Sequence, residues 1–290
     1  MVIKTKTDKV IDAILCVIMA VVVVCTIYPI WYIVVASLSS NAAVTSGRVT
    51  LWIKDFTLES YAFVTKDKNL WIAYGNTVFY SVLGTAVNMI FTILGAYAYS
   101  KPWLPGRRFL MFFVLLSMWF GPGMMATYIN YRDLGMINNR WGMLIIGAVG
   151  TYNMILMRSF FESIPEALEE SALIDGASDF RILVQIYLPL STAAIMTISL
   201  YYFVGHWNAY FWSMILLQDD SKIPLQVLLK KLVVQMTGNS SEQGNMDFTV
   251  LSRETVVYAT MVIAVAPMLI IYPFVQKFFV KGVMIGAVKG

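Results

Sequence analysis

The stretch SIPEALEESALIDGA, residues 163–177, separates two long apolar runs and carries four acidic residues. Ser163 and Glu166 have the spacing of a capping box, and Pro165 suits the first turn of a helix. Gly176 suits the left-handed position that follows a helix. The stretch therefore predicts a helix of about eleven residues, followed by a glycine turn and a second short helix.

The predicted helix has an apolar side and an acidic side. At about 100° per residue, the apolar side carries Ile164, Ala167, Leu168, Ala172 and Ile174. Glu166, Glu169 and Glu170 fall on the other side, with Leu173 among them. A connector lying on lipid also explains this periodicity, but helices at the membrane interface are usually basic. An acidic helix with a central leucine fits better into a partner protein's groove that contains arginine.

The composition is that of a membrane protein. Of 290 residues, 59% are hydrophobic and 13% are charged, and the mean hydropathy is +0.70. The net charge of +4 is spread over the loops without a basic stripe, which argues against nucleic acid as a partner. The single histidine has no cysteine near it, so no metal site is predicted, and no Cys/His/Asp arrangement indicates catalytic residues.

Apolar runs long enough to cross a lipid bilayer as helices recur along the chain. They cover residues 10–36, 70–99, 108–130, 141–161, 185–217 and 255–279. Strand periodicity is absent, and irregular backbone cannot face lipid, so the predicted fold class is an all-α membrane protein with six transmembrane helices. Gly121-Pro122-Gly123 is expected to break or kink the third span.

An even number of spans places both termini on the same side of the membrane. The Lys and Arg counts of the two sides are nearly equal, but the compact basic turn KPWLPGRR, residues 101–108, favours the cytoplasm. We therefore expect a cytoplasmic N-terminus at 1–9, a transmembrane domain at 10–280 and a cytoplasmic tail at 281–290. The acidic loop 162–184 is then cytoplasmic as well.

The segment EESALIDGASDFRILVQIYLP, residues 169–189, resembles the EAA loop of ATP-binding-cassette importer permeases. The family pattern is E-A-A, three residues, Gly and then I-x-L-P, and it falls on Glu170, Ser171, Ala172, Gly176, Ile186, Leu188 and Pro189. Ser171 departs from the family's alanine but is small enough for the same packing. Asp175-Gly176-Ala177 resembles sugar importers of the maltose-transporter type, and GHWNAYFW, residues 205–212, is similar to a stretch late in their fifth helix.

The resemblance implies a permease subunit, in a bacterial inner or plasma membrane, that imports an oligosaccharide delivered by an external solute-binding protein. It also implies a second, different permease chain and two cytoplasmic ATPase subunits, which bind ATP and Mg. This chain has no Gly-x-x-x-x-Gly-Lys-Ser/Thr phosphate loop, so it is expected to be neither an enzyme nor a cofactor carrier. The residues implied to couple to the ATPase are Glu169, Glu170, Ser171, Ala172, Leu173, Asp175, Gly176 and Ala177. Within them, Glu170 would pair with an arginine, Leu173 would fill an apolar pocket and Gly176 would permit the turn.

Polar and aromatic residues within the spans are candidates for the substrate path. They are His206, Trp207, Asn208, Trp119 and Tyr128. Trp207 and Asn208 suit helix packing or gating at least as well, and the aromatic belt at the membrane surface equally accounts for Trp119 and Tyr128. Two alternatives stay open: an ion-coupled secondary transporter, and the same importer architecture for a non-sugar solute such as glycerol phosphate.

Overall fold

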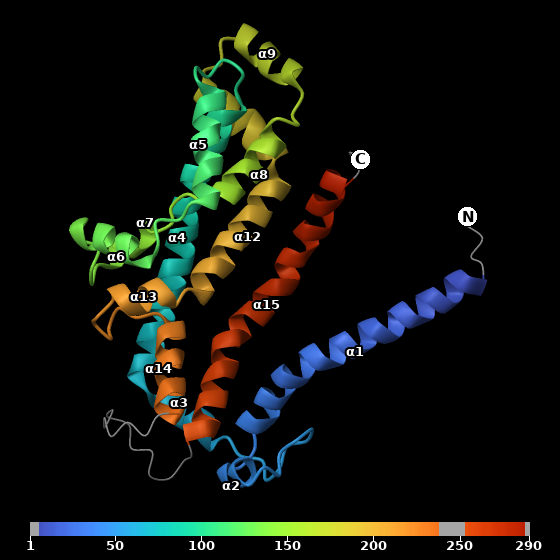
Figure 1. The fold of residues 1–290 in the computed structure, drawn as a ribbon, viewed down its shortest axis with the longest axis vertical. Helices are drawn as coiled ribbons and strands as arrows, with labels where there is room; N and C mark the ends of the chain where they lie inside the picture. The colour runs from blue at the N-terminus through green and yellow to red at the C-terminus, as the bar shows by residue number, and fades with distance from the viewer. Residues whose placement is uncertain (1–5, 238–252, 288–290) are drawn as a thin grey trace. The chain divides into compact units, whose positions relative to one another are not determined.

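The computed structural model describes residues 6–237 and 253–287, and every regular element in these ranges is helical (Figure 1). The predicted all-α fold class is confirmed. The first half of the chain forms α1 (Lys6–Ser37), α2 (Asn41–Thr45), α3 (Glu59–Lys66), α4 (Lys68–Ser100), α5 (Arg107–Trp119), α6 (Met124–Asp133), α7 (Arg140–Ile145) and α8 (Thr151–Phe161). The second half forms α9 (Glu166–Ile174), α10 (Asp179–Ile182), the π-helical turn η1 (Leu183–Tyr187), α11 (Leu188–Leu190), α12 (Thr192–Asn208), α13 (Phe211–Leu216), α14 (Leu225–Thr237) and α15 (Arg253–Ala287). Residues 1–5 and 288–290 of the predicted cytoplasmic ends lie outside the described residues.

Two helices are long and apolar enough to cross a membrane without a break, namely Val10–Ser37 within α1 and all of α4. Two bent pairs would raise the number to four: α5 with α6, bent by 115°, and Asp179–Leu190 with α12, bent by 85°. The predicted run 141–161 is divided between α7 and α8. In the described residues the six predicted spans are therefore not all single helices, and the count of six stays a prediction.

The break expected at Gly121-Pro122-Gly123 is confirmed. Helix α5 ends at Trp119, and Gly123 has a φ of +78°, a left-handed conformation that glycine adopts without steric cost. Proline cannot supply the backbone N–H that a continuing helix needs. Local backbone chemistry alone therefore explains why the third apolar run is bent.

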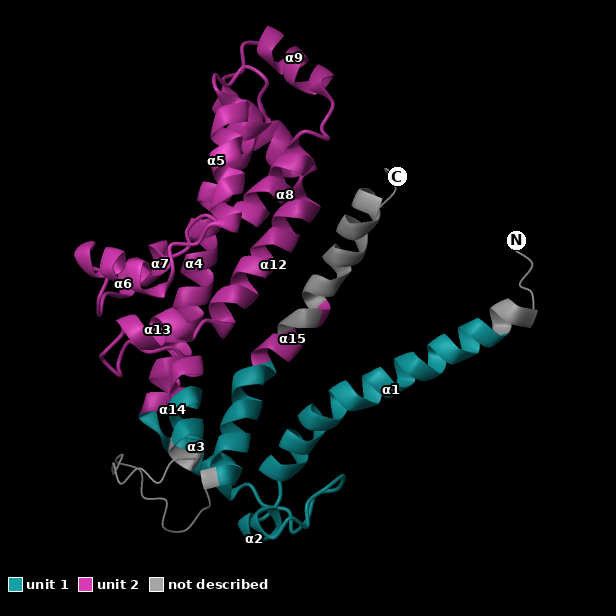
Figure 2. Ribbon diagram, in the orientation of Figure 1, with its two compact units in different colours: residues 1–68, 229–266 teal, residues 69–228, 267–290 magenta. Residues whose placement is uncertain are grey.

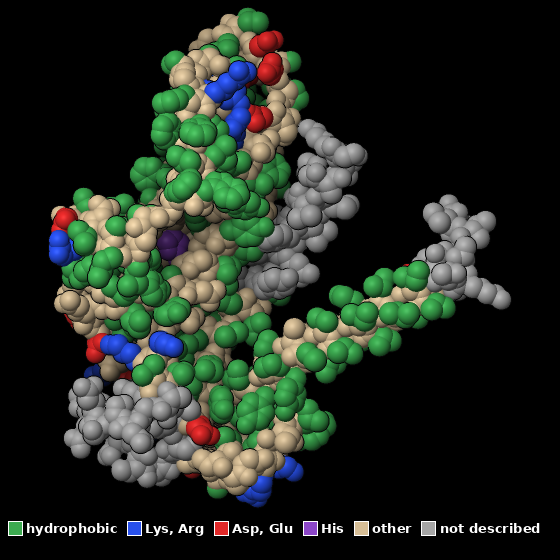
Figure 3. All heavy atoms as spheres, in the orientation of Figure 1, with side chains coloured by type: hydrophobic (Ala, Val, Ile, Leu, Met, Phe, Trp, Pro, Cys, Tyr) green, Lys and Arg blue, Asp and Glu red, His purple; other side chains and the backbone are tan. Residues whose placement is uncertain are grey.

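The chain divides into two compact units, and unit 1 comprises residues 1–68 and 229–266 (Figure 2). Its core contains Val35, Ala36, Ala43, Val44 and Val49. Beside this core Tyr32 and Tyr258 pack edge to face at 5.9 Å. Hydrophobic side chains cover the described part of α1 (Figure 3), and Val10, Ile18 and Val24 are at least half exposed. Such a helix suits contact with lipid or with another apolar helix.

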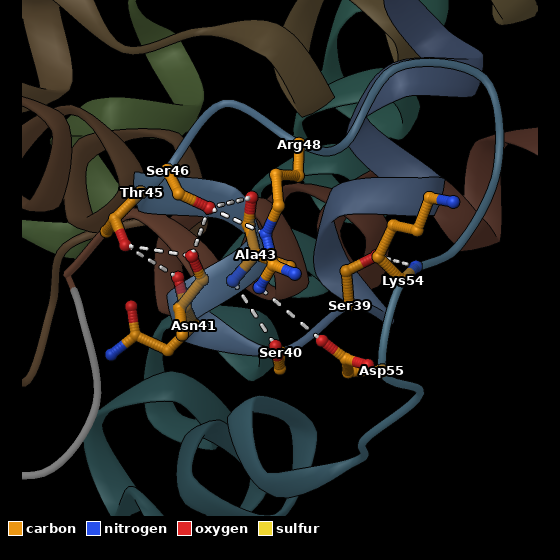
Figure 4. A network of polar contacts seen from close by, with 10 residues as sticks. Ser39, Ser40, Asn41, Ala43, Thr45, Ser46, Arg48, Lys54 and Asp55 are labelled. Carbon is orange, nitrogen blue, oxygen red and sulfur yellow. Dashed lines mark hydrogen bonds and ion pairs between the residues drawn. The ribbon is translucent and has the colours of Figure 1, made fainter.

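Polar contacts hold the loop that follows α1 (Figure 4). Ser40 precedes α2, and its hydroxyl accepts a hydrogen bond from the Ala43 backbone N–H. The Lys54 backbone N–H donates to the Ser39 hydroxyl over 3.1 Å. The loop is thus closed by local serine chemistry of the kind that caps helices.

Unit 2 comprises residues 69–228 and 267–290, and its described core joins α4, α8, η1 and α12. The Tyr202 hydroxyl lies 2.7 Å from that of Thr92 and accepts a hydrogen bond from the Gly150 N–H, which ties α12 to α4 and to the start of α8. A Cβ atom at Gly84 would lie 2.7 Å from the His206 ring, so α4 and α12 approach closely because residue 84 is glycine. Helix α9 lies at one end of this unit, away from α6 and α13 (Figure 1).

Candidate functional site

Helix α9 is shorter than predicted and begins without the capping box. Its N-cap is Pro165, and the Ser163 hydroxyl instead donates to the Phe160 carbonyl at the end of α8, over 2.7 Å. The capping prediction was wrong because Ser163 directly follows another helix, whose last carbonyls also need hydrogen-bond donors. The motif S-x-x-E alone does not reveal that competition.

The end of α9 agrees with the prediction. Gly176 has a φ of +75°, and its N–H donates to the Leu173 carbonyl over 3.0 Å. The Ala177 N–H donates to the Ala172 carbonyl over 2.9 Å. These two bonds form a Schellman motif, in which glycine supplies the left-handed residue. The turn after α9 therefore depends on Gly176.

The side of α9 that faces the unit differs from the predicted apolar side. Ile164 and Ala172 do pack against the core, but Leu168 is 42% exposed and Ile174 is 86% exposed. Glu169, predicted on the outer side, points inward, and its side chain is only 16% exposed. The difference arises because a buried cation from another segment attracts Glu169. The helical periodicity of α9 carries no information about that cation.

That cation is Lys101, the residue that follows α4. Its Nζ donates to Glu169 Oε2 over 2.6 Å and to the Tyr187 hydroxyl over 3.0 Å. Tyr187 in turn donates its hydroxyl proton to Glu169 Oε2 over 2.6 Å. Nearby, Glu162 pairs with Arg107 and, over 2.8 Å, with Arg158, which ties the α8–α9 connection to the start of α5.

Lys101 and Tyr187 are functional candidates that the sequence did not indicate. The turn KPWLPGRR was interpreted only as a basic marker of orientation. A usable signal was present, since Lys101 stands alone at the end of an apolar run, apart from the paired Arg107 and Arg108. Such a lysine is positioned to turn inward towards a carboxylate.

The pKa of Glu169 lies below its ordinary value of 4.5. Burial by itself would raise the pKa, but the hydrogen bonds from Lys101 and Tyr187, together with the charge of Lys101, outweigh it. A carboxyl group whose pKa is lowered by folding stabilises the folded state above its ordinary pKa. That contribution is lost as the pH falls through the lowered pKa.

We therefore expect the difference in thermal stability between wild type and Glu169→Gln to be largest near neutral pH and to shrink below about pH 4.5. Thermal unfolding in detergent across this range measures it. The matched control is Glu170→Gln, because Glu170 is exposed on the same helix. A Glu169→Gln difference that is constant with pH would contradict the role assigned to the Lys101 contact.

The remaining coupling candidates point outward or pack beneath α9. Glu170, Ser171, Leu173 and Asp175 are exposed, whereas Ala177 joins Ala172 against the core. Leu173 is 51% exposed and adjoins the more exposed Ile174. Figure 3 shows acidic and basic side chains gathered at the end of unit 2 that carries α9. The outer surface of α9 thus combines carboxylates with two large apolar side chains.

The substrate-path candidates are placed in different environments. Trp207 is 3% exposed, with Tyr74 edge-on at 6.0 Å and Phe203 stacked at 5.9 Å, a geometry that favours packing. Exposed Asn208 donates its side-chain amide to the Val204 carbonyl in the last turn of α12. His206 is half-buried; its Nε2 lies 2.6 Å from Asn88 Oδ1.

Trp119 and Tyr128 lie on opposite arms of the bend in the third apolar run. Trp119 ends α5 and is 85% exposed, and half-buried Tyr128 lies in α6. Among the residues searched, no group of three or more His, Cys, Asp or Glu side chains is placed to hold a metal ion. Among the described residues, the most buried ion pair is the one beneath α9, between Lys101 and Glu169.

A family described as "Binding-protein-dependent transport system inner membrane component" matches residues 92–285. The chain is 38% identical over 267 residues to the polygalacturonan/rhamnogalacturonan transport system permease protein YtcP of Bacillus subtilis strain 168, covering 91% of this chain and 93% of that protein.

Two crystal structures share the fold. One is of a bacterial ABC transporter involved in the import of the acidic polysaccharide alginate; its chain matches with a TM-score of 0.89 and 42% identity, over 96% of this chain and 100% of that one. The other is of a bacterial alginate ABC transporter in complex with an alginate pentasaccharide-bound periplasmic protein. Its chain has a TM-score of 0.62 at 16% identity over 93% of both chains, a likeness in fold alone.

Proposed function

Because this chain belongs to the family of binding-protein-dependent transport system inner membrane components and is a permease of a sugar importer, we propose that α9 is the helix that couples it to an ATPase. The matched region, residues 92–285, contains α9, the end of α4 and η1. Family membership favours this function over the alternative of an ion-coupled secondary transporter. The homologues are transport subunits and not enzymes.

The outer surface of α9 carries the proposal. Leu173 and Ile174 are exposed by 51% and 86% on a helix otherwise rich in carboxylates. Burying one such side chain is worth about 1.5–3 kcal/mol, so a partner that covers them binds with useful affinity. Glu170 and Glu166 would then face basic groups of that partner, with an arginine as the natural match for Glu170.

The topology is proposed to have six crossings, with both termini and the coupling loop 162–184 in the cytoplasm. Residues 1–9 and 281–290 would be the cytoplasmic ends of a permease domain at 10–280. The two unbroken apolar helices and the two bent pairs support four of these crossings. The other two are proposed to be α7 with α8, and α15. The family description independently makes the chain an inner membrane component.

The proposed partners are a second permease of a different chain, two copies of a cytoplasmic ATPase and an external solute-binding protein. ATP and Mg would bind to the ATPase subunits. The similar structures come from ABC transporters, and one contains a periplasmic protein bound to an alginate pentasaccharide. These likenesses support the assembly for the present chain.

The proposed cargo is an acidic oligosaccharide. The relatives are named for polygalacturonan, rhamnogalacturonan and alginate. His206 is the proposed sugar contact within the membrane, since it is half-buried and hydrogen-bonded to an amide. Trp119 and Tyr128 are proposed to line the path at the bend between α5 and α6. The sugars in these names favour an oligosaccharide over the alternative of a non-sugar solute such as glycerol phosphate.

The test is coexpression with the neighbouring transporter genes, purification through a tag on this chain, and measurement of the ATPase that copurifies. We expect Leu173→Asp to weaken the association at least about tenfold, since about 1.4 kcal/mol corresponds to that factor and a buried leucine contributes more. Leu134→Asp is the matched control, because Leu134 is 61% exposed elsewhere in unit 2.

Two results would count against the proposal. If wild type purifies without an ATPase and transports sugar driven by an ion gradient, the hypothesis of an ATP-driven importer is wrong. If the ATPase copurifies equally with wild type and Leu173→Asp, the importer stands but α9 is not its docking helix.

A further inference from the structure

Lys101 is the one charged residue that is fully buried among those whose burial the structure describes, with 1% of its surface exposed. Its ammonium group, the Glu169 carboxylate and the Tyr187 hydroxyl form a closed ring of hydrogen bonds of 2.6, 3.0 and 2.6 Å. Tyr187 accepts from Lys101 and donates to Glu169, so both roles of its hydroxyl are used. Each of the three groups therefore has the other two as hydrogen-bond partners.

Aromatic rings enclose the same charge. Lys101 Nζ lies 4.2 Å from the centroid of the Tyr97 ring and 4.1 Å from that of Tyr187, within the range of cation–π attraction. Tyr97 and Tyr187 meet edge to face at 5.1 Å, and Phe161 packs edge-on against Tyr187 at 5.4 Å. These rings prevent the lysine side chain from swinging out into solvent.

A buried ion pair of this kind is poor evidence for stability, because desolvation offsets most of the Coulomb attraction. What the three hydrogen bonds do supply is a defined geometry, because Lys101, Glu169 and Tyr187 must keep their relative positions for all three bonds to form. Removing one member leaves an unpaired charge that is costly to keep buried. This ring of hydrogen bonds is consequently suited to holding the three segments that carry Lys101, Glu169 and Tyr187 in a fixed register.

The segments joined here are the end of α4, the middle of α9 and η1. Helix α9 is joined to α8 and α10 by short turns at 162–165 and 175–178. Tyr187 reaches the ring from a π-helical turn, a form that is often found at functional sites. The ring of hydrogen bonds thus connects the middle of α9 to the end of α4 and to η1, which leads into α12.

We propose that Lys101 is a positioning residue that makes α9, the end of α4 and η1 move as one body. This inference rests on the proposed function of α9. It assigns different roles to the adjacent residues Glu169 and Glu170. Glu169 faces inward and transmits the motion of the helix, whereas exposed Glu170 faces the ATPase. A packed, fully paired contact of this type moves as a rigid element between two arrangements of the transporter.

The experiment uses the complete transporter with Lys101→Met/Glu169→Gln, which removes both charges together and leaves none stranded. We expect the ATPase to copurify as with wild type and basal ATP hydrolysis to stay within about twofold. Stimulation by the sugar-loaded binding protein, and sugar transported per ATP, are expected to fall about five- to tenfold, within the usual range of coupling between sites. Arg132→Gln/Asp133→Asn, an exposed ion pair elsewhere, is the matched control.

Tyr187→Phe provides a second, milder variant if the double substitution does not fold. It removes one hydroxyl from the ring and keeps the aromatic contacts, so a smaller loss of stimulation is expected with the ATPase still bound. In the Lys101→Met/Glu169→Gln background, Tyr187→Phe is expected to have little further effect, because groups that act together are not additive.

Unchanged stimulation and unchanged sugar per ATP in both variants would overturn the proposal. So would loss of ATPase binding as large as that of Leu173→Asp, because Lys101 would then only support the docking surface. Both results differ from failure of the proposed function, in which either wild type itself retains no ATPase or Leu173→Asp retains as much ATPase as wild type.

Discussion

Gly176→Pro is expected to abolish ATP hydrolysis stimulated by the sugar-loaded binding protein while the membrane part of the chain stays folded. Proline holds φ near −65°, whereas Gly176 has a φ of +75°. Proline also lacks the N–H that Gly176 donates to Leu173. The Schellman turn cannot form, so α9 is not returned to α10 at the proper angle.

The measurement compares stimulated ATP hydrolysis of reconstituted wild type and variants at equal expression. Gly176→Asn is the matched control, because asparagine visits the left-handed region more readily than other residues with a side chain, and no atom lies within 4 Å of a Cβ at this position. We expect Gly176→Asn to retain most of the activity. Full stimulation in Gly176→Pro would show that α9 does not couple the chain to the ATPase.

Trp207→Ala is expected to lower the free energy of unfolding by about 3–5 kcal/mol, the usual cost of removing a buried aromatic side chain. Trp207 is 3% exposed and contacts Tyr74 and Phe203, so truncation leaves a cavity between α4 and α12. Thermal unfolding in detergent and the yield of folded protein measure the effect. Trp207→Phe should cost much less, since it keeps an aromatic ring in place.

The same variant separates packing from sugar binding. A tryptophan that only stacks on sugar would leave thermal stability unchanged when truncated and would raise the sugar concentration needed for transport. Asn208→Ala is the matched control on the adjacent residue, because the Asn208 side chain is exposed and donates to the Val204 carbonyl of its own helix. Normal stability of Trp207→Ala would contradict the packing role.

The features that could be predicted from the sequence are those with a local cause. Apolar length and the lack of strand periodicity predicted an all-helical membrane protein. The bend at Gly121-Pro122-Gly123 and the turn at Gly176 were predictable, because glycine and proline restrict or permit particular φ values wherever they occur. The family resemblance on residues 169–189 likewise depended on residue types at fixed spacing.

The tertiary structure decided which side of α9 and of α12 faces the rest of the chain. Periodicity placed Glu169 and Glu170 together on an acidic side, yet Glu169 turns inward because Lys101, 68 positions earlier, ends beneath it. Burial of Trp207 depends in the same way on Tyr74 from another helix. Side-chain spacing determines angles around one axis, whereas pairing and burial depend on what the rest of the chain brings to the opposite side.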